Sequence, residues 1–250
     1  MSIYKELILS KKKRIKKLAV LIDPDKTHLD QLDRLLRKFN DAHVDYILVG
    51  GSLILDDRSR HLIDIIKSSV SVPVILFPGN INQIQDNADA LLFLSLISGR
   101  NPELLIGKHV EIAAQLKKSS LEIISTGYML IDGGKPTTVS YMSHTQAIPR
   151  DKDGIAVATA VAGELLGLKM IYLEAGSGAI KPVSSSMISA VSQAIDIPLI
   201  VGGGIRTPEK ALENINAGAD IIVVGNALEK DPELIIDLSA AIHSVNSLVH

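Results

Sequence analysis

The chain has 250 residues, of which 46% are hydrophobic, and a formal net charge of −2 at pH 7. This length suits one α/β barrel with a large core, and the near-neutral charge gives no general reason to bind nucleic acid or a membrane surface. The chain contains no cysteine, which excludes disulfides and thiolate metal sites.

At the N-terminus, MSIYKELILS is too short and too polar for the core of a signal peptide. No apolar run in the chain approaches the length of a membrane-spanning helix. We therefore expect a cytoplasmic protein with no stable membrane insertion. The basic run KKKRIKK (11–17) precedes the first predicted strand, and we expect it to form a solvated helix or arm.

Short apolar runs rich in β-branched residues alternate along the chain with segments whose apolar residues are three or four apart. The predicted strands are LAVLID (18–23), YILVGG (46–51), PVILF (73–77), ALLFLSL (90–96), LEIIST (121–126), MIYLEA (170–175), PLIVGG (198–203) and DIIVVG (220–225). The predicted helices cover residues 28–40, 59–69, 102–118, 153–166, 185–194, 208–217 and 228–245.

Strict alternation of unbroken apolar strands with helices predicts a parallel sheet, and eight strands predict closure into a TIM (β/α)8 barrel. We expect one domain over residues 1–250. An open doubly wound sheet is the alternative, but no GxGxxG motif follows the first strand.

Two connections depart from a regular barrel. Residues 78–89 are too few for a full helix and its loops, so a shortened segment is expected in place of the third helix. Residues 127–152 form a long polar connection, and long ordered loops on the catalytic face of this fold are often lids.

Glycines follow the last three predicted strands, as AGSG (175–178), GGGI (202–205) and GN (225–226). Glycine allows unusual backbone angles and lets backbone N–H groups approach a phosphate. Barrels often bind phosphate with the loops after strands seven and eight. The three clusters together predict a phosphate-binding barrel, although many reactions share that feature.

On the other side of the barrel mouth, Asp23 ends the first strand and Ser52 follows the second. Mg²⁺ prefers hard oxygen ligands and often takes only one or two from the protein. The pair therefore suits a metal that arrives with a diphosphate. The alternative is a simple turn at Asp23, in which Asp25 or Thr27 caps the next helix.

Several motifs together resemble the geranylgeranylglyceryl phosphate synthase family, over nearly the whole chain. They are IDPDK (22–26), VGGS (49–52), LFPG (76–79), SGRNPELLIG (98–107), GYMLIDGG (127–134), YLEAGSG (172–178), VGGGIRTPEKA (201–211) and VVGN (223–226). The resemblance implies transfer of a prenyl group from an isoprenoid diphosphate to the 3-hydroxyl of sn-glycerol 1-phosphate, with Mg²⁺. It also implies a homo-oligomer, either a dimer or a hexamer.

The family pattern assigns Mg²⁺ to Asp23 and Ser52, and it places Arg100 and Tyr128 near the mouth without a definite role. The segment 179–182 departs from the pattern, which leaves the shape of that loop open. The implied glycerol phosphate contacts are Tyr172, Leu173, Glu174, Ala175, Gly176, Ser177, Gly178, Gly203, Gly204, Gly225 and Asn226.

The carboxylate of Glu174 cannot touch the phosphate directly, because like charges at close range repel by about 4 kcal/mol. Strand residues advance about 3.3 Å each, so Gly176–Gly178 can lie roughly 7–13 Å beyond Glu174. That separation can span a glycerol from its phosphate to its far hydroxyl. Under the resemblance, Glu174 accepts the proton of that hydroxyl, and alternation places Tyr172 on the same strand face while Leu173 packs outward.

We expect a geranylgeranyl (C20) donor, and the alternative within the family is a longer prenyl diphosphate such as heptaprenyl. The gap at 78–89 is where an apolar groove for the prenyl chain could lie. Outside the family, there are two alternatives. One is another phosphate-binding barrel enzyme, namely a phosphosugar isomerase or lyase, and the other is a non-catalytic sensor of phosphate ligands.

Overall fold

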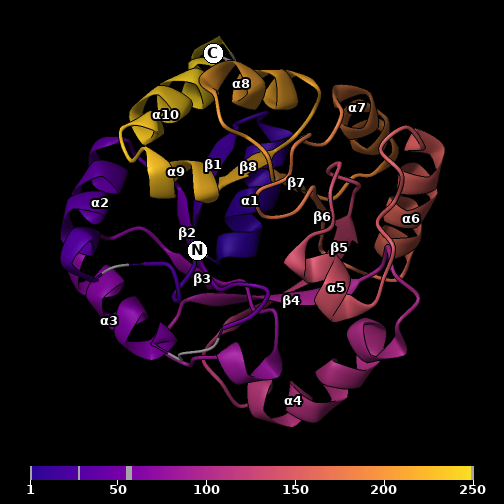
Figure 1. The fold of residues 1–250 in the computed structure, drawn as a ribbon, viewed down its shortest axis with the longest axis horizontal. Helices are drawn as coiled ribbons and strands as arrows, with labels where there is room; N and C mark the ends of the chain where they lie inside the picture. The colour runs from indigo at the N-terminus through magenta and orange to yellow at the C-terminus, as the bar shows by residue number, and fades with distance from the viewer. Residues whose placement is uncertain (1, 28, 55–57, 249–250) are drawn as a thin grey trace.

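The computed structural model describes residues 2–27, 29–54 and 58–248. Its described strands close into a parallel barrel in chain order, with β8 pairing with β1. Helices surround the barrel, as Figure 1 shows. The predicted barrel is confirmed, and the open sheet is excluded. The strands are β1 (Lys17–Ile22), β2 (Tyr46–Val49), β3 (Val74–Leu76), β4 (Ala90–Leu96), β5 (Glu122–Leu130), β6 (Met170–Glu174), β7 (Leu199–Gly202) and β8 (Ile221–Val224).

The helical elements follow the predicted alternation. They are α1 (Ile3–Lys12), α2 (Leu29–Asp41), α3 (Ser59–Ser69), the 3₁₀ turn η1 (Ile81–Gln83), the π-helical turn η2 (Glu103–Gly107), α4 (Lys108–Leu116), α5 (Thr138–Ser143), α6 (Asp153–Leu165), α7 (Ser185–Ala194), α8 (Pro208–Asn216), α9 (Asn226–Lys230), α10 (Leu234–Ser244) and the 3₁₀ turn η3 (Asn246–Leu248). His28, the first residue of the predicted helix 28–40, lies outside the described residues.

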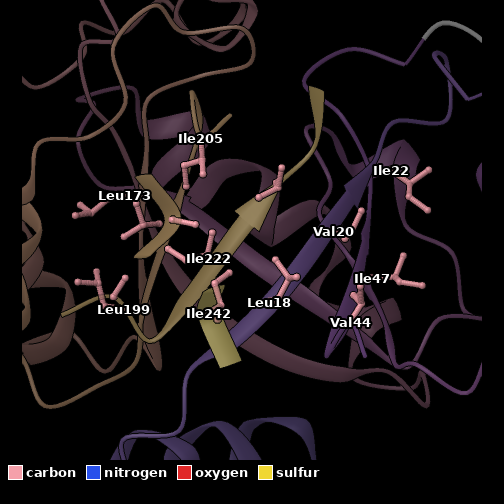
Figure 2. Packing of buried hydrophobic residues seen from close by; sticks show 14 of the residues in the cluster. Leu18, Val20, Ile22, Val44, Ile47, Leu173, Leu199, Ile205, Ile222 and Ile242 are labelled. Atoms are coloured by element: carbon pink, nitrogen blue, oxygen red, sulfur yellow. The ribbon is translucent and has the colours of Figure 1, made fainter. Parts of the chain in front are cut away.

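Each strand divides its side chains between two apolar layers, because successive side chains point to opposite faces. The outer layer, between barrel and helices, includes Leu18, Val20 and Ile222, and Figure 2 shows these on β1 and β8. The inner layer fills the barrel and includes Ala19 and Tyr172. Alternation also directs the residues that end strands on the inner face toward the barrel mouth.

Helix α1 closes the N-terminal end of the barrel, and the prediction of a solvated helix or arm at residues 11–17 is correct for the exposed residues 12–14 but wrong for the lysines on either side of them. Lys11 and Lys16 pair with Asp220 at 3.0 and 3.2 Å, and Lys17 begins β1. Their shared partner Asp220 directly precedes β8 and is buried. The side chains of Lys11 and Lys16 are therefore largely covered as well.

Two predicted boundaries are also corrected. The connection after the fifth strand starts later than residue 127, because Gly127–Leu130 continue to pair with β6; the remaining loop carries α5. The predicted helix 228–245 is divided into α9 and α10. Asp231, which precedes Pro232, is extended, as residues before proline usually are.

The connection from β3 to β4 contains only η1, as the short segment 78–89 predicts. The ring of helices is therefore thin at this position. No helix in the described part of the chain is long and apolar enough to cross a membrane.

Candidate active site

A cavity of about 270 Å³ lies at the C-terminal end of the barrel, and we call it the polar cavity. Segments that follow seven of the strands, all except β4, line it, which brings residues far apart in sequence to one place. Most of the predicted site residues line it, namely Asp23, Ser52, Tyr172, Glu174, Gly176, Ser177, Gly178, Gly203, Gly204, Gly225 and Asn226.

Three other residues that match the family pattern do not line the polar cavity. The side chain of Leu173 is fully buried in the outer apolar layer, as alternation predicts, so it points away from the cavity. Ala175 is also buried in that layer. Arg100 donates to the carbonyl oxygens of Ile97 and Gly99 and is a loop-stabilising residue in this structure.

Glu174 ends β6 with its carboxylate buried in the wall of the polar cavity. Its Oε1 accepts a hydrogen bond of 2.6 Å from the Gly176 backbone nitrogen. Burial raises the pKa of Glu174 from 4.5 to about 7, and the Gly176 and Tyr172 donors only partly oppose this. A carboxyl group that titrates near neutral pH can hold or release a proton under physiological conditions.

The position beside Glu174 requires glycine. Gly203 has a φ of +83°, and a Cβ there would overlap the Glu174 carboxylate and the backbone nitrogens of Ala175 and Gly176. The loop after β7 can therefore approach the loop after β6 only without a side chain.

The glycine loops after β6 and β8 meet across the cavity. Ser177 Oγ donates to Asn226 Oδ1 at 3.0 Å, which joins the two loops. Gly176 and Gly178 both have positive φ values, +96° and +71°. Backbone N–H groups in such turns form concave anion sites, so this wall of the cavity suits a phosphate.

The proposed metal ligands follow β1 and β2, next to β8 in the barrel. The Asp23 carboxylate lies against Gly51, so it is close to Ser52, and it pairs with Lys26 at 3.0 Å. The turn of the alternative is present as well, since Thr27 Oγ1 donates to the Asp23 carbonyl oxygen, while capping of the next helix by Asp25 or Thr27 stays a prediction. The described residues contain no group of three acidic or histidine side chains that could hold a metal alone. The donor set fits a Mg²⁺ that takes most of its ligands from a diphosphate and water.

Three aromatic rings in mutual contact lie where the polar cavity meets a second hollow. Phe77 lies 5.3 Å from Tyr172 and 5.9 Å from Tyr128 between ring centroids, and the two tyrosines are 5.4 Å apart. Burial and then the Glu174 charge raise the pKa of both tyrosines well above the usual value, so they stay neutral. Sequence reasoning missed Phe77, although its place at the end of the third strand, in LFPG, is a signal.

The second hollow is a groove of about 420 Å³, and we call it the apolar groove. It runs past η1 to α4, where the ring of helices is thin, and it shares Ser52, Phe77 and Tyr128 with the polar cavity. Its further lining is mainly apolar and includes Ile84, Leu92, Phe93, Leu94, Leu104 and Ile112. This groove could hold a long apolar chain whose reactive end reaches the polar cavity.

Comparisons with known proteins agree with this geometry. The sequence model of the PcrB family matches residues 10–243. A geranylgeranylglyceryl phosphate synthase of Chitinophaga pinensis is 55% identical over 97% of this chain and 96% of its own length. The enzyme of the same name from Pyrococcus furiosus is 44% identical over 84% of this chain and 83% of its own.

Solved structures extend the comparison. The (S)-3-O-geranylgeranylglyceryl phosphate synthase of Thermoplasma acidophilum, in complex with its substrate sn-glycerol-1-phosphate, superposes with a TM-score of 0.92. It is 34% identical and covers 98% of this chain and 99% of its own. The tryptophan synthase alpha chain of Legionella pneumophila reaches 0.60 at 18% identity over 99% of each chain, which shows a shared fold only.

Proposed function

The chain belongs to the PcrB family and is a prenyltransferase, and we propose that it transfers a geranylgeranyl group to sn-glycerol 1-phosphate. The acceptor atom is the 3-hydroxyl oxygen, and the donor is geranylgeranyl diphosphate. The products are an ether-linked glycerol phosphate and diphosphate.

The observation that carries the proposal is the position of Glu174. Its buried carboxylate stands between the glycine loops that suit a phosphate and the aromatic rings at the end of the apolar groove. A glycerol phosphate bound by those loops directs its far hydroxyl toward Glu174. The carboxylate holds that hydroxyl by a hydrogen bond and accepts its proton as the C–O bond forms.

The donor is held by the loops after β1 and β2 and by the groove. Asp23 and Ser52 would hold a Mg²⁺ together with the diphosphate, and Lys26, which now pairs with Asp23, would turn toward the diphosphate oxygens. The ion, when bound, neutralises the leaving diphosphate. The groove side chains bind the prenyl tail, which becomes shielded from water.

The aromatic rings supply the remaining electrostatic element. As the C–O bond to diphosphate breaks, positive charge develops on the first prenyl carbon at the junction of groove and cavity. The faces of Phe77 and Tyr128, which line both hollows, favour a cation there. Neutral tyrosines do not compete with Glu174 for the proton.

The test is a product assay with prenyl diphosphates of C15, C20 and C35, each with sn-glycerol 1-phosphate or sn-glycerol 3-phosphate. We expect the C20 donor and the 1-phosphate acceptor to give the highest kcat/KM, and EDTA to abolish turnover until Mg²⁺ is restored. Glu174→Gln should lower kcat by roughly two to four orders of magnitude, because it cannot take the proton.

The Glu209→Gln variant, altered at the exposed start of α8, is the matched control and should keep wild-type turnover. A Glu174→Gln enzyme with wild-type kcat would remove this residue from the chemistry. A C35 preference would leave the reaction unchanged and correct the donor.

A further inference from the structure

The segment between β5 and α5 packs directly on the glycine loop after β6. The Gly133 carbonyl oxygen accepts hydrogen bonds of 3.0 Å from the backbone nitrogens of both Ile180 and Lys181. The Asp132 carboxylate accepts from the Gly134 nitrogen at 2.8 Å, which shapes the turn that follows. One end of the segment is therefore fixed to the far side of the AGSG loop.

The other end of the segment is fixed to the near side of the same loop. The Thr137 side chain lies against Gly176 so closely that a Cβ on Gly176 would overlap it. Thr137 also forms a capping box with Ser140, which begins α5. The chain between Gly133 and Thr137 must therefore cross directly over residues 176–180.

Lys135 is at the middle of this crossing. Its Nζ lies 3.4 Å from the position that a Cβ on Gly178 would occupy, so the ammonium group stands beside the glycine loop. Within the described ranges, Lys135 is in no ion pair. Arg206, which lines the polar cavity, donates to the Ala179 carbonyl oxygen through one of its nitrogens.

We propose that Lys135 binds the phosphate of the acceptor substrate and closes the phosphate site from the solvent side. The inference rests on the proposed function and adds a residue to its acceptor site. A phosphate monoester carries nearly two negative charges at pH 7, whereas the loops after β6, β7 and β8 offer backbone dipoles and one guanidinium, that of Arg206. An ammonium group supplies a full compensating charge and up to three donors at that end.

The experiment measures binding of sn-glycerol 1-phosphate and of inorganic phosphate by titration calorimetry, and it measures steady-state kinetics. Lys135→Gln should raise both dissociation constants roughly tenfold, the range expected for a partly exposed charge-assisted hydrogen bond. The KM for glycerol phosphate should rise similarly while kcat stays unchanged, because the contact is made equally before and during reaction. Lys135→Arg should restore most of the affinity.

Lys181→Gln is the matched control, since Lys181 is an exposed lysine of the same loop whose side-chain carbons lie beside Gly134. Its variant should bind as the wild type does. Unchanged affinity in Lys135→Gln, or an equal loss in Lys181→Gln, would overturn the role of Lys135 and leave the proposed function intact. A wild-type protein that does not bind glycerol phosphate at all would overturn both.

Discussion

At the residue scale, Glu174 shows how one carboxylate can serve beside a phosphate site. The strand keeps it on the inner face, and the turn that follows brings the Gly176 backbone nitrogen onto its Oε1, which leaves the loop beyond Gly176 for the proposed phosphate. In the proposed complex, the acceptor itself separates the two charges. Burial, which raises the pKa of Glu174, also makes the ionised group costly for the folded state.

The cost of burying the ionised Glu174 carboxyl group predicts that the free energy of unfolding depends on pH. Because the folded pKa of about 7 exceeds the unfolded value of 4.5, the folded state binds this proton more tightly. The resulting stabilisation is fully present below the unfolded pKa and is lost as the pH rises through 7. Between pH 4.5 and 8, wild type should lose about 3 kcal/mol of unfolding free energy relative to Glu174→Gln.

Urea denaturation of both proteins at several pH values checks this difference. Glu209→Gln serves as the comparison, because hydrogen bonds from its own backbone and from Thr207 lower the pKa of Glu209. That variant should show no such trend from pH 5.5 to 8. If the unfolding free energies of wild type and Glu174→Gln differed by a constant amount over this range, the pKa of Glu174 would not be raised by folding.

At the element scale, α1 is bound to the barrel through its first turn. The Glu122 carboxylate, at the start of β5, accepts hydrogen bonds of 2.7 and 2.8 Å from the backbone nitrogens of Ile3 and Tyr4. A carboxylate at a helix N-terminus satisfies free N–H groups and interacts favourably with the helix dipole. The interior side chains Ile3 and Leu7 then seal the barrel end.

Glu122→Gln should therefore lower the unfolding free energy by about 1–2 kcal/mol. The neutral amide has only one acceptor oxygen, so it cannot accept both hydrogen bonds, and it loses the contribution of the charge. The melting temperature should fall by a few degrees, measured by calorimetry. Glu111→Gln removes an exposed pair with Lys108 on α4 and should change stability by less than about 1 kcal/mol. Equal effects of the two substitutions would contradict this role of Glu122.

At the scale of the whole molecule, the apolar groove exists because one element of the repeat is reduced. Every other strand connection supplies a packed helix, whereas the one after β3 supplies only η1. The inner face of the barrel mouth is thereby connected to a long apolar hollow. A barrel with a full helix here would cover that hollow.

Filling the groove should discriminate between donors by length. Ile112 lines the groove but not the polar cavity, so Ile112→Trp should lower kcat/KM for the C20 donor by roughly tenfold or more while sparing a C10 donor. Val110→Trp, on the exposed side of the same helix, is the control and should spare both donors. An equal loss for both donors in Ile112→Trp would place the prenyl chain elsewhere.

The sequence by itself determined the eight-stranded barrel, the short third connection and most of the polar cavity. These follow from alternation and from glycines at strand ends, which are local properties of the chain. It misjudged Lys11, Lys16 and the length of β5, because ion pairs with Asp220 and pairing with β6 join distant parts of the sequence.

Only the tertiary structure decided how these parts meet. It placed Phe77 against Tyr128 and Tyr172, and it brought Lys135 beside Gly178. No spacing in the chain encodes such contacts, because each depends on the closure of the barrel and on where a loop is held at both ends.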